Sequence, residues 1–235
     1  MNKVDTRAGV DIGGTFTDIV ACQKERVVVE KVLSTPAEPD RAVVGGLGPV
    51  LSSLNGQLDE FRHGTTVATN AILEGKGVKT AFVVTRGFSD LLELRRQNRP
   101  HLYSLAQSSP PPLIPKDLCF SVIERIAADG AIITPLNEKE AETVASKVKK
   151  SGAIAASVCF LFSYLEPAHE LIMKEALRKE GIHVSLSHEV MAARGEYERS
   201  CATVWNGLVS PIMAKYLEEM EKKLQPKSFW VMSSR

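Results

Sequence analysis

Apolar residues open the chain in three short runs, over residues 9–12, 16–21 and 26–33. Short runs rich in β-branched residues and bounded by turn residues are typical of strands. Gly13-Gly14-Thr15 separates the first run from the second, so the pattern predicts a β-meander at the start of the chain. Residues 40–54 then have helical spacing, although three glycines in this segment lower its helix propensity.

Strand-like and helix-like segments alternate through the rest of the chain. The pattern predicts strands over 61–66, 80–85, 153–162, 182–186 and 228–232, and helices over 67–73, 137–150 and 167–180. Residues 196–224 read as one long helix or as two helices divided near Pro211. Asp129-Gly130 predicts a hairpin between 119–127 and 131–134, and Asn137 with Glu140 predicts a capping box. This order indicates an α/β fold with a mixed sheet.

Composition narrows the function classes but names none. The 235 residues carry a formal net charge of +1, and 44% of them are hydrophobic. A near-neutral charge argues against a dedicated binder of nucleic acid or of anionic membranes, since such proteins usually carry a basic excess. The four cysteines are scattered, the N-terminus is polar, and no apolar run approaches the roughly 20 residues that span a bilayer. We therefore expect a cytoplasmic protein without a signal peptide.

The run Asp11-Ile12-Gly13-Gly14-Thr15-Phe16-Thr17-Asp18 is the most informative segment. Two glycines between strands are expected to adopt positive φ and to let the backbone approach a ligand closely, with exposed amides that suit phosphate oxygens. Thr15 and Thr17 add hydroxyl donors, because alternate residues face the same side of a strand. Asp11 ends the first strand, where one carboxylate suits a largely hydrated Mg²⁺ ion. A plain Gly-Gly hairpin turn remains the alternative.

A second polar segment begins at His63 and reads HGTTVATNAILEG. Gly64-Thr65-Thr66 lies where a predicted strand passes into a helix, a place at which amides and hydroxyls can face an anion. An ordinary helix start explains the same residues about equally well, and a lone histidine such as His63 is more often a packed core residue than a catalytic one.

Two charged clusters have open interpretations. An arginine in Arg95-Arg96-Gln97-Asn98-Arg99 could hold a substrate carboxylate or a transferred phosphoryl group, or the cluster could be a solvated basic loop. Glu196, Glu198 and Arg199 are either catalytic or ordinary ion pairs on a helix surface.

Taken together, GVDIGGTFTDIV and HGTTVATNAILEGKGVKTAFVVTRGFSDLLELRRQNRPHLY resemble the N-terminal region of the hydantoinase A/5-oxoprolinase family. Later stretches agree, among them FLFSY, PAHE, SHEV and EYER. The family includes N-methylhydantoinase A, 5-oxoprolinase and related subunits of acetone and acetophenone carboxylases. The resemblance implies an actin-like, RNase H-like ATPase half-domain in an enzyme that activates a carbonyl or amide oxygen by phosphorylation.

The resemblance also implies roles for individual residues. The cofactors would be ATP and Mg²⁺, and the substrate a small cyclic amide or ketone. The expected catalytic residues are Asp11, Thr65 and Thr66, and Asp11 is also the expected metal ligand. The expected phosphate-binding residues are Gly13, Gly14, Thr15, Thr17 and Gly64. Arg95 and Arg99 are expected to bind the substrate.

The family's pattern continues beyond this chain, and no second D-x-G-G-T run occurs within it. We expect residues 1–186 to form the N-terminal family region and residues 187–235 the start of a truncated central region. The missing C-terminal half of the enzyme and a hydantoinase B-like subunit are the expected partners. A small sugar kinase and a non-catalytic nucleotide-binding subunit of a carboxylase complex are the alternative functions.

Overall fold

The computed structural model describes residues 6–35, 39–54, 58–98, 111–226 and 228–233, and it divides the chain into two compact units. Unit 1 comprises Met1–Gly75 and Ile212–Arg235, and unit 2 comprises Lys76–Pro211. Each unit has its own sheet and its own hydrophobic core. None of the helices in the described ranges is both long and apolar enough to cross a bilayer.

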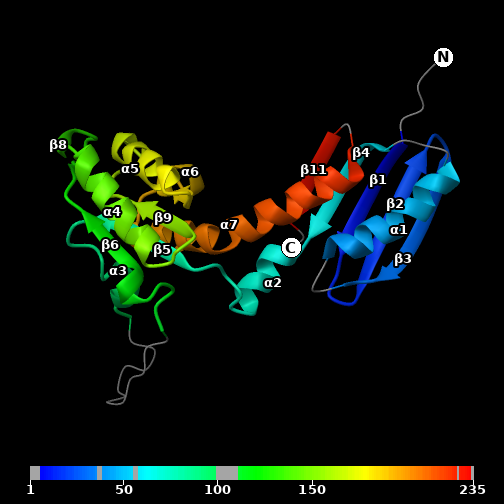
Figure 1. Cartoon of the computed structure of the whole chain (residues 1–235), viewed down its shortest axis with the longest axis horizontal. Helices are drawn as coiled ribbons and strands as arrows, with labels where there is room; N and C mark the ends of the chain where they lie inside the picture. Colours follow the sequence, from blue (N-terminus) through cyan, green and yellow to red (C-terminus); the bar gives the residue numbers. More distant parts are fainter. Residues whose placement is uncertain (1–5, 36–38, 55–57, 99–110, 227, 234–235) are drawn as a thin grey trace. The chain divides into compact units, whose positions relative to one another are not determined.

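Unit 1 is built on a five-stranded mixed sheet (Figure 1). The sheet order is β11-β4-β1-β2-β3, formed by β1 (Thr6–Ile12), β2 (Phe16–Gln23), β3 (Arg26–Leu33), β4 (Leu58–Thr65) and β11 (Ser228–Ser233). The first three strands pair antiparallel, β4 runs parallel to β1, and β11 runs parallel to β4. The expected meander and mixed sheet are confirmed, in the strand order of an actin-like, RNase H-like half-domain.

Helix α1 (Pro39–Leu54) packs against the strands of the meander (Figure 1). Apolar residues of α1, of β1, β2 and β4, and of the last part of α7 (Glu196–Leu224) form one core. The glycines of α1 do not break the helix, and Gly46 has a packing role. A Cβ at Gly46 would lie 2.3 Å from Cδ1 of Ile19 and 3.1 Å from Cγ1 of Val32. Close contact between helix and sheet therefore requires glycine at this position.

His63 is a core residue of unit 1, fully buried on β4. Its Nδ1 lies 3.3 Å from the carbonyl oxygen of Val10, which only accepts, so Nδ1 carries a proton. Burial lowers the pKa of His63 below its ordinary value, against the smaller opposing effects of Val10 and Asp11. The neutral ring then accepts at Nε2 from the hydroxyl of Tyr216, at 2.7 Å. His63 thus joins β1 to α7 and is not a free base.

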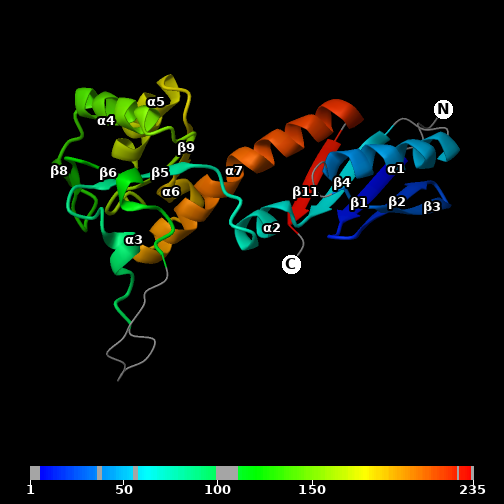
Figure 2. The same cartoon turned by 60° about the horizontal axis from the view of Figure 1, so that its bottom comes forward.

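Unit 2 contains a four-stranded parallel sheet in the order β10-β9-β5-β6. Its strands are β5 (Thr80–Thr85), β6 (Cys119–Val122), β9 (Ala155–Cys159) and β10 (His183–Leu186). Helices α4 (Glu138–Lys150) and α5 (Ala168–Lys179) contact each other and pack on this sheet (Figure 2). A second cluster joins apolar residues of β5 to α3 (Leu91–Leu94), a 3₁₀ turn (Lys116–Leu118) and the first part of α7. Burial on both faces explains the continuous apolar run in β9.

Several expected details are wrong. The predicted hairpin arm 119–127 is divided, because β6 joins the parallel sheet and only β7 (Arg125–Ile126) pairs with β8 (Ile132–Thr134). Asn137 caps α4 through Lys139 N at 2.9 Å, but Glu140 accepts from Ile123 N instead of completing a capping box.

The long C-terminal helix is continuous, and one further helix was not expected. Helix α7 runs through Pro211, although the boundary between the two units falls directly after that proline. The short helices α2 (Val67–Leu73) and α6 (Ser187–Val190) complete the structure, and the pattern had not indicated α6. These spatial units do not coincide with the predicted boundary at residue 186, which stays a prediction about sequence regions.

Replacing Gly46 by alanine is expected to destabilise unit 1 by about 1–3 kcal/mol, because the new methyl group overpacks the contact with Ile19. Gly48→Ala in the same helix is the matched control, since a Cβ there meets nothing within 4 Å. The control should be neutral or stabilising by up to about 1 kcal/mol through helix propensity. Urea denaturation measures both effects, and equal free energies of unfolding for the two variants would contradict this packing role.

The buried neutral His63 predicts a loss of stability in mild acid. A lowered folded-state pKa means that the unfolded chain binds the proton more readily. The free energy of unfolding should therefore be constant above about pH 6.5 and should fall as the pH drops below that value. Denaturation between pH 5 and 8 should show a weaker dependence for His63→Phe. His183→Gln, at an exposed histidine, should keep the dependence of the parent chain.

Candidate functional site

The two polar segments singled out in the sequence meet in unit 1. The parallel register of β1 and β4 pairs Asp11 with Gly64 and Ile12 with Thr65. The turn after β1 and the turn after β4 therefore lie at the same end of the sheet, where the carboxyl ends of parallel strands meet. This edge is the usual ligand site of open α/β sheets.

Asp11 projects from the face of the sheet that is not packed in the unit 1 core. Its side chain is exposed, and a Cβ placed on Gly64 would lie 2.8 Å from its Oδ1 and 3.5 Å from its Cγ. Gly64 thus provides the space that the carboxylate occupies. The neighbouring acid, Asp18, is paired with Lys31 at 2.5 Å. Asp11 therefore differs from Asp18: its carboxylate is exposed at the strand end, in the space that Gly64 leaves open.

The Gly-Gly turn is built differently from the expectation. Neither Gly13 nor Gly14 has a positive φ, so that part of the prediction is wrong. Gly13 is needed for space, since its Cβ would lie 3.0 Å from the carbonyl oxygen of Phe16, which accepts from Gly13 N at 3.0 Å. Gly14 is open to solvent. Within the described residues, the amides of Gly14 and Thr15 have no hydrogen-bond acceptor and are free for a ligand.

Ser34 holds this turn in place, a role that the sequence did not suggest. Its hydroxyl donates to Gly13 O at 2.8 Å, and its amide donates to Thr15 O at 2.9 Å. Thr17 is fully buried and lies 2.9 Å from the Ser34 hydroxyl, to which it must donate because the single Ser34 hydrogen is already used. Thr17 therefore positions the turn through Ser34, whereas Thr15 is exposed.

Thr65 and Thr66 are also engaged in local bonds. Thr65 is buried and accepts from Val67 N at 3.2 Å. Thr66 lies within 3.4 Å of Ile12 O, to which its hydroxyl donates, and accepts from the Asn70 side chain at 3.3 Å. The Thr66 contact links the second polar turn directly to the first. The geometry thus favours a role for Thr66 in holding the two turns together, whereas Thr65 bonds within the second turn.

Metal-binding groups are sparse in the described ranges, which contain no cluster of three or more His, Cys, Asp or Glu side chains that could hold an ion. A Mg²⁺ ion needs few protein carboxylates, because it keeps several waters and shares phosphate oxygens. The single carboxylate of Asp11 is sufficient for that requirement.

The arginine cluster belongs to unit 2, whereas the two polar turns belong to unit 1. Arg95 has a left-handed backbone, with φ of 54°, and donates to Pro111 O at 3.1 Å. Arg96 pairs with Glu198 at 2.5 Å, which raises the pKa of the arginine and lowers that of the carboxyl group. Arg99 lies outside the described residues. Its role and that of Arg95 in substrate binding stay predictions.

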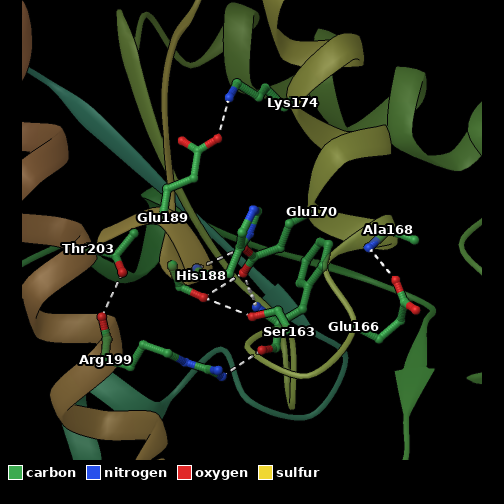
Figure 3. A network of polar contacts seen from close by, with 11 residues as sticks. Ser163, Glu166, Ala168, Glu170, Lys174, His188, Glu189, Arg199 and Thr203 are labelled. Atoms are coloured by element: carbon green, nitrogen blue, oxygen red, sulfur yellow. Dashed lines mark hydrogen bonds and ion pairs between the residues drawn. The ribbon is translucent and has the colours of Figure 1, made fainter. Parts of the chain in front are cut away.

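Unit 2 contains a buried polar network that the sequence patterns did not reveal (Figure 3). Glu170 is fully buried and accepts from Phe160 N, from the Ser187 hydroxyl, and from both the backbone amide and Nδ1 of His188. Arg199 reaches from α7 to Phe160 O at 2.6 Å and is only 1% exposed. Of the two interpretations left open for Arg199, the surface ion pair is therefore wrong. Such residues escape sequence reasoning because their partners are 10 to 40 positions away.

Comparison with known proteins places the chain in a family. Residues 7–181 match the family model described as the hydantoinase/oxoprolinase N-terminal region. An uncharacterised protein of Methanocaldococcus jannaschii is 37% identical over 95% of this chain and 34% of its own length. Caprolactamase subunit alpha of Pseudomonas jessenii is 32% identical over 94% of this chain and 34% of its own length.

Solved structures agree with these sequence relatives. The ATP-dependent caprolactamase from Pseudomonas jessenii superposes with a TM-score of 0.81 at 29% identity, covering 97% of this chain and 35% of that one. Nucleotide-free acetone carboxylase shares the fold, with a TM-score of 0.80 at 23% identity, covering 96% of this chain and 35% of that one. The chain spans about a third of the length of the relatives that it matches. It belongs to the hydantoinase/oxoprolinase family and corresponds to its N-terminal region.

Proposed function

We propose that this chain is the nucleotide-binding N-terminal region of an ATP-dependent enzyme that opens a cyclic amide. The observation that carries the proposal is the exposed Asp11 carboxylate over Gly64, beside a turn with two free amides. Family membership and the ATP-dependent caprolactamase relative support it. Phosphorylation of the carbonyl oxygen would make the amide carbon more electrophilic, so that water could add to it. The C–N bond would then break, with the proton of the added water passing to the departing nitrogen, and hydrolysis of the resulting acyl phosphate would release phosphate.

In this proposal the turn of unit 1 binds the phosphates of ATP. The amides of Gly14 and Thr15 and the exposed Thr15 hydroxyl would donate to phosphate oxygens. Thr17, Ser34 and Thr66 keep the donors fixed, so that little ordering is needed when the nucleotide binds. Catalysis of phosphoryl transfer rests mainly on such positioning and on charge stabilisation.

Asp11 would hold the Mg²⁺ ion that accompanies ATP. When bound, this ion neutralises the negative charge that develops on the phosphates. The single exposed carboxylate, for which Gly64 leaves room, fits an ion that keeps most of its own waters. Asp11 is thus proposed as an orienting group for the metal-nucleotide complex.

Family membership supports a proposal for the class of substrate and for a partner subunit. We propose a small cyclic amide, such as a hydantoin, 5-oxoproline or another lactam, with a ketone as the alternative that the carboxylase relative suggests. The name of caprolactamase subunit alpha implies at least one further subunit in that relative, and we propose a hydantoinase B-like partner here. The rest of the enzyme would supply the other half of the nucleotide cleft.

Asp11→Asn in the full-length gene product should lower substrate-dependent ATP hydrolysis by about 100-fold or more, since it removes the charge that orients the metal. Activity is measured as phosphate release with 5-oxoproline, hydantoins, lactams and small ketones. Asp18→Asn, at the acid paired with Lys31, is the control and should retain activity. If the parent protein binds the nucleotide but hydrolyses no ATP with any of these substrates, a non-catalytic nucleotide-binding subunit would be favoured instead.

Calorimetric titration of the 235-residue chain with Mg-ATP tests the half-cleft separately. Only weak binding is expected, because the turn of unit 1 contacts the phosphates and provides no second clamp. Micromolar affinity of this chain alone would overturn the half-cleft interpretation.

Gly64→Ala tests the space reserved for the Asp11 carboxylate. The new methyl group would lie 2.8 Å from Oδ1 and should displace it, reducing Mg-ATP affinity of the full-length protein by about 10- to 100-fold. Gly9→Ala on the same strand and face as Asp11 meets nothing within 4 Å and should bind normally. An unchanged affinity in Gly64→Ala, with the fold verified by circular dichroism, would show that the carboxylate position is unimportant.

A further inference from the structure

Polar residues gather at the carboxyl ends of the four parallel strands in unit 2. Thr85 ends β5, Glu124 follows β6, the backbone N–H and C=O of Phe160 follow β9, and Ser187 follows β10. The side chains of Thr85, Glu124 and Ser187 are buried. This edge is where open parallel sheets bind ligands, because strand ends and loops converge there. Its chemistry is independent of the two polar turns of unit 1.

Arg199 is the member of this group whose bonding is incomplete. It is among the largest fully buried side chains, with 1% of its surface exposed, and its Nη2 donates to Phe160 O at 2.6 Å. Its Nε and Nη1 atoms are buried and have no hydrogen-bond partner in the described part of the chain. A buried guanidinium with unused N–H groups is costly, and buried polar groups in folded proteins are nearly always bonded.

The two buried carboxylates near the strand ends do not complete the bonding of Arg199. Oε1 of Glu170 accepts hydrogen bonds from Phe160 N and from the Ser187 hydroxyl, at 3.0 and 2.6 Å. Its Oε2 accepts from the backbone amide and the Nδ1 atom of His188, at 3.2 and 2.6 Å. Four donors saturate this carboxylate, and none of them comes from Arg199.

Glu124 is committed in the same way. It accepts from the Thr85 hydroxyl and lies 2.7 Å from Nδ1 of His169. The Leu136 amide donates to Nε2 of His169 at 3.2 Å, so that histidine is neutral and donates from Nδ1. The protein thus buries a cation, while the two buried carboxylates near the strand ends bond to other donors.

The loop after β9 covers the guanidinium. The ring of Tyr164 lies over it with 5.1 Å between the ring centroid and Cζ, a contact that leaves the in-plane N–H groups unused. Phe162 in this loop has φ of 56°, a left-handed conformation that is strained for a bulky residue. Phe162 and Tyr164 are partly exposed, so the ligand would approach from the loop side.

We propose that Arg199 is the anchor of an oxyanion site at the carboxyl edge of the unit 2 sheet. The ligand is a small molecule with a carboxylate or phosphate group. Its oxygens accept hydrogen bonds from the N–H groups that the protein leaves unpaired. Pairs of carboxylate or phosphate oxygens match the guanidinium in charge and in donor geometry. The site lies in unit 2 and does not depend on the nucleotide function proposed for unit 1.

The most direct test follows the Arg199 Nε–H resonance of the 235-residue chain by ¹H–¹⁵N spectroscopy. Separate titrations use inorganic phosphate and acetate, with sodium chloride at matched ionic strength as the reference. A saturable shift of this resonance with either oxyanion supports the site, and the anion that acts identifies the ligand group. Phosphate bound at the unit 1 turn would not move it. No shift with either anion would show that the free N–H groups are satisfied by water alone and would overturn the proposal.

Variants provide the second test through the melting temperature. The effective anion at about 100 times its Kd should raise the Tm of the parent chain by about 5 °C or more. Arg199→Met should lose this rise, and Arg199→Lys should keep only part of it. Arg178→Met, at an exposed arginine of α5 in the same unit, is the matched control and should keep it all. A rise that persists in Arg199→Met would place the anion elsewhere. If that variant does not fold, the resonance titration decides.

Discussion

The parallel pairing of β1 with β4 is the constraint from which the candidate site of unit 1 follows. Parallel strands need a crossover, and here α1 lies within the connection and packs on the meander. The register then places Gly64 beside Asp11 on the open face, while His63 points into the core and bonds to Tyr216. A slip by one residue would exchange these faces, since side chains alternate along a strand. This one pairing thus fixes both side chains: the neutral His63 is buried, and the carboxylate of Asp11, which pairs with the next β4 residue, is exposed.

The two proposed sites would balance negative charge in different ways, and both are compatible with a net charge of +1. In unit 1 the proposed donors are backbone amides at Gly14 and Thr15, and the charge of the nucleotide would be balanced by a metal at Asp11. In unit 2 the positive charge is a single buried side chain, Arg199, and the buried carboxylates of Glu170 and Glu124 bond to other donors. Neither arrangement requires a basic surface, so composition could not have indicated either site.

Local patterns predicted the elements well because periodicity reflects burial. They failed where a side chain chose a partner far along the chain. Glu140 bonds to Ile123 N instead of the start of its own helix, and Thr17 bonds to Ser34, a partner that the pattern did not indicate. The glycines of the first turn were assigned the wrong cause: Gly13 is needed because a Cβ would meet Phe16 O, and not because of a positive φ. These choices depend on distances of a few tenths of an ångström, which no residue pattern contains.

The sequence by itself determined the meander, the alternating strands and helices, the family, and the residues around Asp11, because these follow from hydrophobic spacing and from a long local motif. Only the tertiary structure decided that Gly64 makes room for the Asp11 carboxylate and that Arg199 is a buried cation with unused donors. The physical reason is the same in both cases. Steric room and hydrogen-bond saturation are properties of atoms brought together from distant parts of the chain, and they exist only once the strands have paired.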